Sequence, residues 1–283
     1  LTINSGGVYS ATSGITEINN TALNTYALNN DGTLTANGGT INITSQTASQ
    51  YYLDIATGSG NPYNFVVDIG GGNSLKWIFD GGVIDGNLTV QSGTFNSNAD
   101  LYDLTVTGDT VVSGTLSNGG SDAMTFGSLA IKSGGTYSAT SGTTTINSED
   151  GSNHALDCDG TFTANSGNVS IETGASTIVD ILCTGSLYDL DIDNTGVATY
   201  WEHDAATIAN DLVITAGSFR AGTTTHDITV TGDVLVQNTG TLGIATESGA
   251  RSFGSLTINS GGTYVATSGT TTLTSESGSG RVI

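Results

Sequence analysis

Positive charge is scarce in this sequence. Only 5 of the 283 residues are Lys or Arg, against 26 Asp or Glu, which gives a formal net charge of −21. Nucleic-acid binding needs clustered cations that neutralise phosphates, and docking on an anionic membrane needs basic segments. We therefore expect no nucleic-acid partner. The sequence also lacks the run of roughly 18 apolar residues that a membrane-spanning helix needs, so no membrane insertion is expected.

Proline and helix-forming residues are also rare. The single proline is Pro62, whereas glycine occurs 41 times without the Gly-x-y period of collagen. Lys, Arg, Glu, Gln and Met, which favour helices, are few, and Thr, Ser, Asn and Gly dominate. An apolar fraction of 36% supplies enough core material for folding. The composition predicts an all-β protein with many tight turns.

An internal repeat organises the chain. The stretches LTINSGGVYSATSG from Leu1, LAIKSGGTYSATSG from Leu129 and LTINSGGTYVATSG from Leu256 align without gaps. The long repeat therefore spans about 127 residues. Two whole copies, residues 1–128 and 129–255, are followed by the start of a third, residues 256–283. We expect the copies to form one continuous structure.

A shorter rhythm runs inside each copy. Motifs such as Leu1-Thr2-Ile3, in which two apolar residues flank a polar one, are followed by small residues and glycine. They recur about every 21 residues, which suits one coil of a β-solenoid with three short strands per coil. We predict a right-handed parallel β-solenoid. A string of β-sandwich modules is the less favoured alternative, because sandwich strands are joined by longer, irregular loops.

The densest acidic cluster is LYDLDIDN, which contains Asp189, Asp191 and Asp193. Because side chains alternate along a strand, all three carboxylates would lie on one face, with neighbours about 7 Å apart. That separation permits glycoside hydrolysis, which uses two carboxyl groups roughly 5 to 9.5 Å apart. We favour the simpler interpretation, a solvent-facing acidic strand, and assign no catalytic residue.

The same carboxylates are weak calcium candidates, because calcium prefers oxygen ligands. A second pair, Asp157 and Asp159, precedes Gly160 in a predicted turn. Neither the glycine-rich calcium nonapeptide nor the Asp-x-Asp-x-Asp-Gly loop is present. We expect no cofactor, with incidental calcium binding at Asp157, Asp159, Asp189, Asp191 and Asp193 as the exception to test.

The internal repeat indicates the roles of the histidines and tryptophans. Each histidine aligns with an aromatic residue of the first copy, and the two tryptophans align with each other. The histidine pairs are His154 with Tyr26, His203 with Phe79 and His226 with Tyr102, and the tryptophans are Trp77 and Trp201. This pattern favours packing roles for the histidines. For the tryptophans it favours core positions over an exposed sugar-stacking platform.

Two cysteines are too few for a disulfide scaffold, and they lack zinc-binding spacing. Cys158 and Cys183 are separated by about one coil, so their side chains would stack on adjacent coils. A disulfide and a pair of free buried thiols are equally compatible with this spacing.

The runs LTINSGGTYVATSGTTTLTSE, DLYDLTVTGDTVVSGTL and NDLVITAGSF resemble repeat-rich β-solenoid surface proteins. These include adhesins of the filamentous-haemagglutinin and autotransporter types, and long fibre or virion-associated proteins of marine phages. The resemblance covers nearly the whole chain and lies in composition and rhythm, so it assigns no functional residue. It implies a shaft outside the cell, at a cell surface or on a virion, that displays something or grips a surface.

We therefore expect a non-catalytic structural protein that forms the shaft of a fibre, filament or adhesin. The alternatives are a carbohydrate-active enzyme on the same fold, either a hydrolase or a lyase, and a calcium-stabilised glycan-binding module. Unpaired strand edges at a coil end favour further pairing. Further copies or flanking segments are thus expected to stack at the ends, within a homo-oligomer or larger assembly. A host-surface glycan is a further expected partner.

Overall fold

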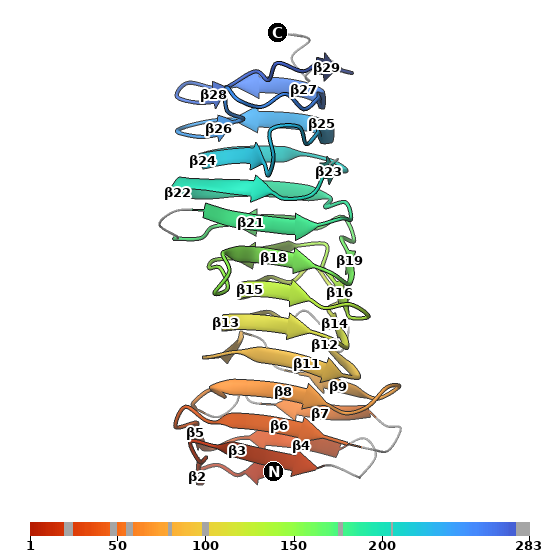
Figure 1. Ribbon diagram of the computed structural model, residues 1–283. Coiled ribbons are helices and arrows are strands. Elements are labelled where there is room, and N and C mark those ends of the chain that lie inside the picture. The colour runs from red at the N-terminus through yellow and green to blue at the C-terminus, as the bar shows by residue number, and fades with distance from the viewer. Residues whose placement is uncertain are drawn as a thin grey trace. The chain divides into compact units, whose positions relative to one another are not determined.

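The computed structural model is a β-solenoid, as the sequence predicts. It describes residues 1–19, 25–45, 50–54, 59–78, 81–97, 102–174, 178–204 and 206–275. These residues form parallel strands that stack into about 11 coils, and they contain no helix (Figure 1). Two compact units are distinguished. Unit 1 comprises Leu1–Thr143 and Gly160–Asn165, and unit 2 comprises Thr144–Asp159 and Ser166–Ile283.

Unit 1 is built from short strands of two to nine residues. They are β1 (Thr2–Ile3), β2 (Val8–Ser10), β3 (Ile15–Asn19), β4 (Thr25–Asn30), β5 (Thr33–Thr35), β6 (Thr40–Thr44), β7 (Gln50–Asp54), β8 (Asn64–Asp68), β9 (Ser74–Trp77), β10 (Gly82–Ile84), β11 (Leu88–Ser92), β12 (Thr94–Ser97), β13 (Leu104–Val112), β14 (Thr115–Ser117), β15 (Met124–Ile131), β16 (Thr136–Ser138) and β19 (Thr161–Thr163).

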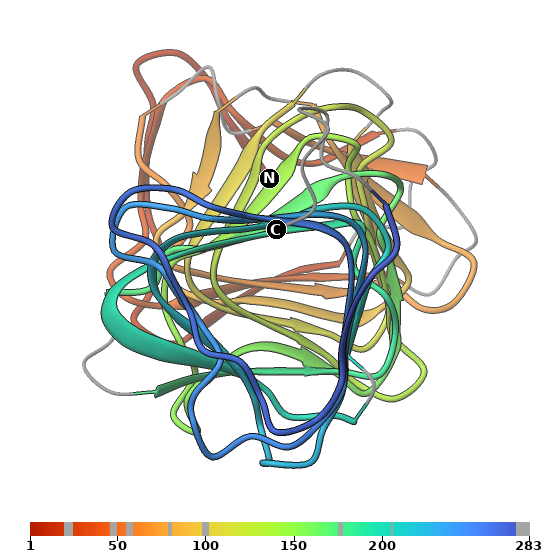
Figure 2. The same ribbon diagram turned by 90° about the horizontal axis from the view of Figure 1, so that it is seen from above.

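Unit 2 contains longer strands that turn a corner of the coil. Its strands are β17 (Thr143–Ile146, all but the first residue), β18 (His154–Cys158), β20 (Asn168–Ile171), β21 (Ile178–Cys183), β22 (Asp189–Trp201), β23 (Ala206–Ile208), β24 (Leu212–Ala221), β25 (Ile228–Val236), β26 (Thr241–Leu242), β27 (Arg251–Ile258), β28 (Thr263–Tyr264) and β29 (Thr271–Leu273). Seen from above, the last coils nearly superpose (Figure 2).

The strand register gives the coil lengths. In unit 1, Leu116 of β14 lies opposite Tyr137 of β16, 21 positions later, which matches the predicted coil. Nearer the N-terminus, Ile3 of β1 lies opposite Asn30 of β4, 27 positions later. This coil is therefore longer than the predicted one. The three strand segments per coil are confirmed in β13 and β14, since β13 shifts register at a corner between Val106 and Asp109.

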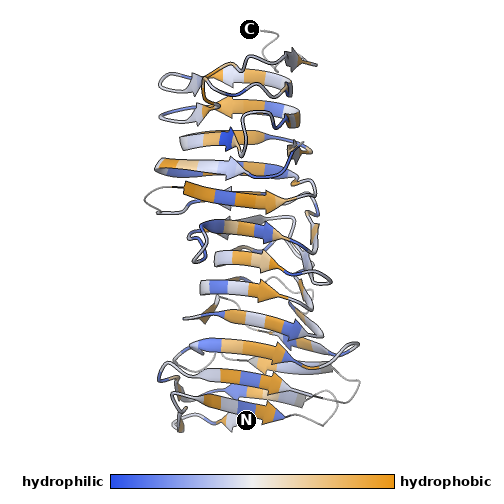
Figure 3. Ribbon diagram, in the orientation of Figure 1, coloured by the Kyte–Doolittle hydropathy of each residue, from blue (hydrophilic) through white to orange (hydrophobic). Residues whose placement is uncertain are grey.

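Alternation of apolar and polar residues places the core. Along β24, Leu212 and Ile214 are fully buried, while Val213 and Thr215, which alternate with them, are partly exposed. Figure 3 shows the same alternation along strands of both units. One coil cannot bury its inward side chains alone, so each relies on stacked neighbours. This requirement explains why the same alternation recurs along strands of both units.

Aromatic residues fill the core at repeated positions. Trp77 packs against Phe95 with ring centroids 4.7 Å apart, and in unit 2 Trp201 packs against Phe219 at 6.4 Å. Both indoles are almost fully buried. The predicted core role of the tryptophans is confirmed, and a sugar-stacking platform at these positions is excluded.

Side-chain hydrogen bonds join the coil corners of unit 1. We call Asn64, Asn87, Asp109 and Ser128 the first corner ladder. Asn64 Oδ1 accepts from the Asn87 backbone N–H at 3.0 Å, and Asn87 Oδ1 accepts from the Asp109 N–H at 2.9 Å. Asp109 Oδ1 then accepts from the Ser128 hydroxyl at 2.8 Å. Each side chain thus satisfies a polar group of the following coil.

Unit 2 repeats this device with more carboxylates. The second corner ladder consists of Asp189, Asp211, Asp233 and Ser255. Asp189 Oδ1 accepts from the Asp211 N–H at 2.9 Å, and Asp211 Oδ1 accepts from the Asp233 N–H at 2.7 Å. Asp233 Oδ1 accepts from the Ser255 hydroxyl at 2.6 Å. Hydrogen bonds to a charged acceptor are the stronger kind, so these carboxylates stabilise coil stacking.

Gly232, beside the second corner ladder, occupies a position with no room for a larger side chain. A Cβ on Gly232 would lie 2.3 Å from Asp211 Oδ1 and 2.6 Å from the Asn210 carbonyl oxygen. We expect Gly232→Ala to lower the free energy of unfolding by about 1–3 kcal/mol, the usual cost of overpacking. Chemical denaturation measures the change. Gly185→Ala is the matched control, because no atom lies within 4 Å of its added Cβ. Equal stability of the two variants would contradict this account.

Candidate functional site

The acidic cluster lies on β22, with the alternation that the sequence predicts. Leu190 and Ile192 are fully buried, whereas Asp189 and Asp191 are partly exposed and Asp193 is exposed. The three carboxylates therefore lie on the outer side of the strand. The register shifts at Asp193, so this residue begins an irregular segment.

The carboxylates of Asp189 and Asp191 accept hydrogen bonds from neighbouring coils. Asp189 Oδ1 accepts from Asn210 Nδ2 at 2.7 Å, in addition to the Asp211 N–H of the second corner ladder. Asp191 Oδ2 accepts from Asn168 Nδ2 at 2.8 Å. The donors belong to the coils on either side. These contacts give Asp189 and Asp191 a structural function.

The electrostatic environment of Asp191 disfavours its charged form. Burial raises the pKa of its carboxyl group above the ordinary value of 3.8, and nearby Asp189 and Glu172 raise the pKa further. The hydrogen bond from Asn168 acts in the opposite direction. Because the pKa is higher in the folded than in the unfolded chain, the protonated carboxyl group favours the folded state. This contribution to stability is complete below the unfolded-state pKa and is lost as pH rises through the folded-state pKa.

We expect Asp191→Asn to raise the melting temperature by a few degrees at pH 7. The amide removes the cost of ionising a partly buried group and keeps an oxygen for Asn168 Nδ2. The gain should disappear below the ordinary pKa of 3.8, where the wild-type carboxyl is protonated. Thermal melts between pH 3 and 7 measure the effect. The exposed residue Asp193 provides the control Asp193→Asn, and an equal gain in this variant would contradict the burial argument.

The calcium candidates do not come together in a metal cluster. Asp157 is 9% exposed on β18, and Asp159 is exposed in the following turn. Over the ranges that the structure describes, no group of three or more His, Cys, Asp or Glu residues is arranged to hold a metal ion. No observation therefore favours a calcium site at Asp157, Asp159 or the acidic cluster.

The histidines are less buried than a packing role predicts. His154 is partly exposed, and its Nδ1 lies 3.3 Å from Asp150 Oδ2. The packing prediction is incomplete for this residue, because the turn before β18 brings the carboxylate to the ring. His203 and His226 are also partly exposed. Phe79, the counterpart of His203, lies outside the described residues.

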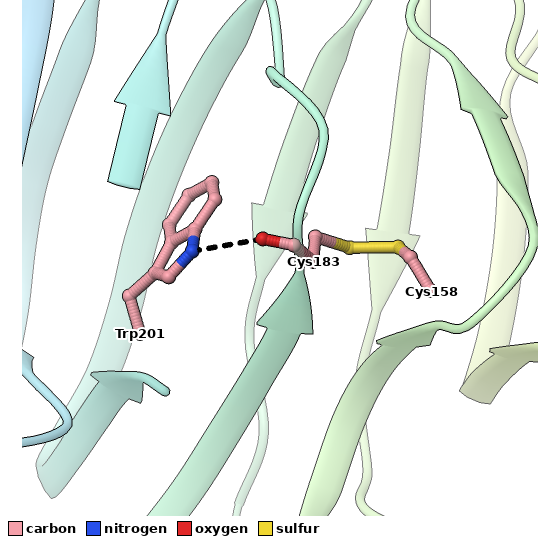
Figure 4. Close-up of a disulfide and its surroundings, with 3 residues drawn as sticks. All are labelled: Cys158, Cys183 and Trp201. Atoms are coloured by element: carbon pink, nitrogen blue, oxygen red, sulfur yellow. Dashed lines mark hydrogen bonds between the residues drawn. A yellow bond between two sulfur atoms is a disulfide. The ribbon is translucent and has the colours of Figure 1, made fainter. Parts of the chain in front are cut away.

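The cysteines form a disulfide between adjacent coils. Cys158 ends β18 and Cys183 ends β21, and the two are register partners with Cα atoms 4.7 Å apart. The indole N–H of Trp201 donates to the Cys183 carbonyl oxygen at 3.1 Å (Figure 4). Of the two alternatives that the sequence left open, the structure thus has the covalent one.

A shallow groove of about 610 Å³ lies on the outer face of unit 2. Its floor is formed by small residues of β22 and β24, including Ala198 and Ser218, which are register partners. One wall is an irregular segment of β22, where the six residues from Asp193 to Ala198 lie opposite only the three residues of β24 from Ala216 to Ser218. The groove is lined by Ile178, Thr195, Gly196, Val197, Ala198, Tyr200, Gly217, Ser218, Arg220, Thr239 and Thr241.

Tyr200 and Arg220 form the other wall of this groove. They are register partners on β22 and β24. The Arg220 Nη1 donates to the Tyr200 hydroxyl at 3.1 Å, and its guanidinium carbon lies 5.7 Å from the ring centroid. Sequence reasoning missed this pair. The available signal was the repeat, in which Arg220 replaces Asn96 and Tyr200 replaces Lys76.

Comparisons with protein-family models, with curated proteins and with solved structures gave no match to this chain. Within the described ranges, no helix has the length and apolar character needed to cross a membrane.

Proposed function

We propose that this chain is a non-catalytic structural solenoid, the shaft of a fibre, filament or adhesin that is used for surface display or attachment. The observation that carries this proposal is the use of the candidate catalytic carboxylates. Asp189 and Asp191 hold neighbouring coils together through hydrogen bonds. A catalytic pair would instead face a cleft in which substrate and water could reach both groups.

The proposed function of the shaft is mechanical. Within each unit, backbone hydrogen bonds join neighbouring coils, and a corner ladder adds side-chain hydrogen bonds between several of them. A load is therefore shared among many hydrogen bonds. Outward Thr and Ser residues suit a sheet face in water. The net charge of −21 opposes side-by-side association. These properties suit a stiff protein in a protease-rich environment.

The proposed location is extracellular, at a cell surface or on a virion. Stacking with further copies or flanking segments is part of the same proposal, because unpaired strand edges favour pairing. The outer faces of unit 1 also carry apolar residues, since Val8 is 72% and Ile15 is 70% exposed. A partner that covers them would bury apolar surface, which favours association.

Incubation with a panel of neutral and acidic polysaccharides tests the absence of catalysis. Mass spectrometry of the products should show intact glycans with the wild-type chain and with Asp191→Asn alike. Bond cleavage by the wild type that disappears in Asp191→Asn would overturn the proposal in favour of a carbohydrate-active enzyme. A thermal melt of this variant at pH 7 distinguishes lost cleavage from unfolding.

A further inference from the structure

The groove of unit 2 differs in charge from the rest of the chain. The chain has 26 acidic residues and 5 Lys or Arg, yet the groove lining includes Arg220 and no carboxylate. Within the described part of the chain, the Arg220 guanidinium makes no ion pair, and its Nε has no hydrogen-bond partner. This is a local cationic site that the fold leaves without an anion.

The contacts of Arg220 fix its position in the groove. Its Nη1 donates to the Tyr200 hydroxyl, and the guanidinium lies near the tyrosine ring. Such contacts restrict the long side chain before any ligand arrives, which lowers the entropic cost of binding. A planar guanidinium held this way is suited to a carboxylate.

The rest of the lining indicates the kind of molecule that carries this carboxylate. Ser218, Thr239 and Thr241 contribute hydroxyl groups, and glycine and alanine keep the floor shallow. Hydroxyls that both donate and accept match the many hydroxyls of a sugar. A peptide is less suited, because β22 pairs with β21 on one side and β24 on the other. No free edge of β22 is available there for strand addition.

We propose that this groove binds an acidic oligosaccharide, with a sugar carboxylate paired to Arg220 and the saccharide extending over Ser218 and Thr241. The inference rests on the proposed attachment function and names its ligand class. Asp180 limits the orientation of the ligand, because it is the register partner of Tyr200 on the coil opposite Arg220. The sugar carboxylate must therefore lie on the Arg220 side of the tyrosine ring.

Binding of tetragalacturonate, measured by isothermal titration calorimetry and ligand-observed NMR, tests the proposal. We expect the wild-type chain to bind this probe, and to bind its methyl ester at least about tenfold more weakly, because the ester lacks the charge that pairs with Arg220. Arg220→Gln should cause a similar loss. Thr239→Glu, at an exposed turn of the groove, should also weaken binding by adding a like charge.

Lys76→Gln is the matched control. It removes one positive charge at the repeat position equivalent to Tyr200, in unit 1, and should leave binding unchanged. Thermal melts confirm that each variant is folded.

The proposal is overturned if tetragalacturonate does not bind, if the ester binds equally well, or if Lys76→Gln weakens binding as much as Arg220→Gln. Equal binding of tetraglutamate would replace the saccharide with an acidic peptide. In these four cases the structural function stands. Cleavage of the probe by the wild type would instead overturn the non-catalytic function while leaving the groove as a binding site.

Discussion

Replacing Arg251 with methionine is expected to lower the free energy of unfolding by about 3–5 kcal/mol, the usual cost of removing one partner of a buried ion pair. Arg251 Nη2 lies 2.6 Å from Glu247 Oε2, and both side chains are almost completely buried. Without the guanidinium, the Glu247 carboxylate stays in the interior without a counter-ion. Chemical denaturation monitored by circular dichroism measures the loss.

The internal repeat supplies the control for this experiment. Arg251 replaces Met124 of the first copy, and Glu247 replaces Gly120, so a methionine fits the equivalent core position. The double variant Arg251→Met with Glu247→Gln removes both charges and keeps an acceptor for the Ala221 N–H, which now donates to Glu247 Oε1. It should recover at least half of the stability. A single variant as stable as the wild type would contradict the assigned role of the pair.

Replacing both cysteines with serine is expected to lower the free energy of unfolding of unit 2 by about 3.5 kcal/mol. This value follows from the loop of about 25 residues that the disulfide closes in the unfolded chain. Reduction of the wild type should produce the same loss. Because solenoid coils interact mainly with their neighbours, the effect should centre on β18 and β21.

Tryptophan fluorescence can separate the two units in this experiment. Trp201 donates to the carbonyl of Cys183, whereas Trp77 belongs to unit 1. In a Trp77→Phe background, unfolding reported by Trp201 should shift to lower denaturant after reduction. In a Trp201→Phe background, the transition reported by Trp77 should shift less. Equal shifts would contradict local stabilisation, and no shift would contradict the disulfide itself.

The solenoid could be predicted because its information is local and repeated. Alternation such as Leu190-Asp191-Ile192 specifies which residues face the core. The Gly-Asp pair of the first copy, Gly108-Asp109, recurs in the second copy as Gly232-Asp233 and marks a corner. Positions such as Trp77 and Trp201 could be assigned to the core because the second copy keeps the residue of the first. Each of these features needs only a few neighbouring residues to be understood.

Features that depend on register between coils could not be predicted in the same way. The disulfide needs Cys158 directly opposite Cys183, and an approximate coil length cannot fix register to one residue. The groove beside Arg220 arises where three extra residues of β22 leave the register with β24. A sequence shows neither the irregular segment nor the arginine without an ion pair.

Immunogold electron microscopy of the source material tests the central claim, a structural shaft at a surface, most directly. Antibodies raised against the folded chain should label an extended appendage that projects from a cell or a virion. Labelling of dispersed molecules inside cells, with none on any appendage or particle surface, would contradict the account.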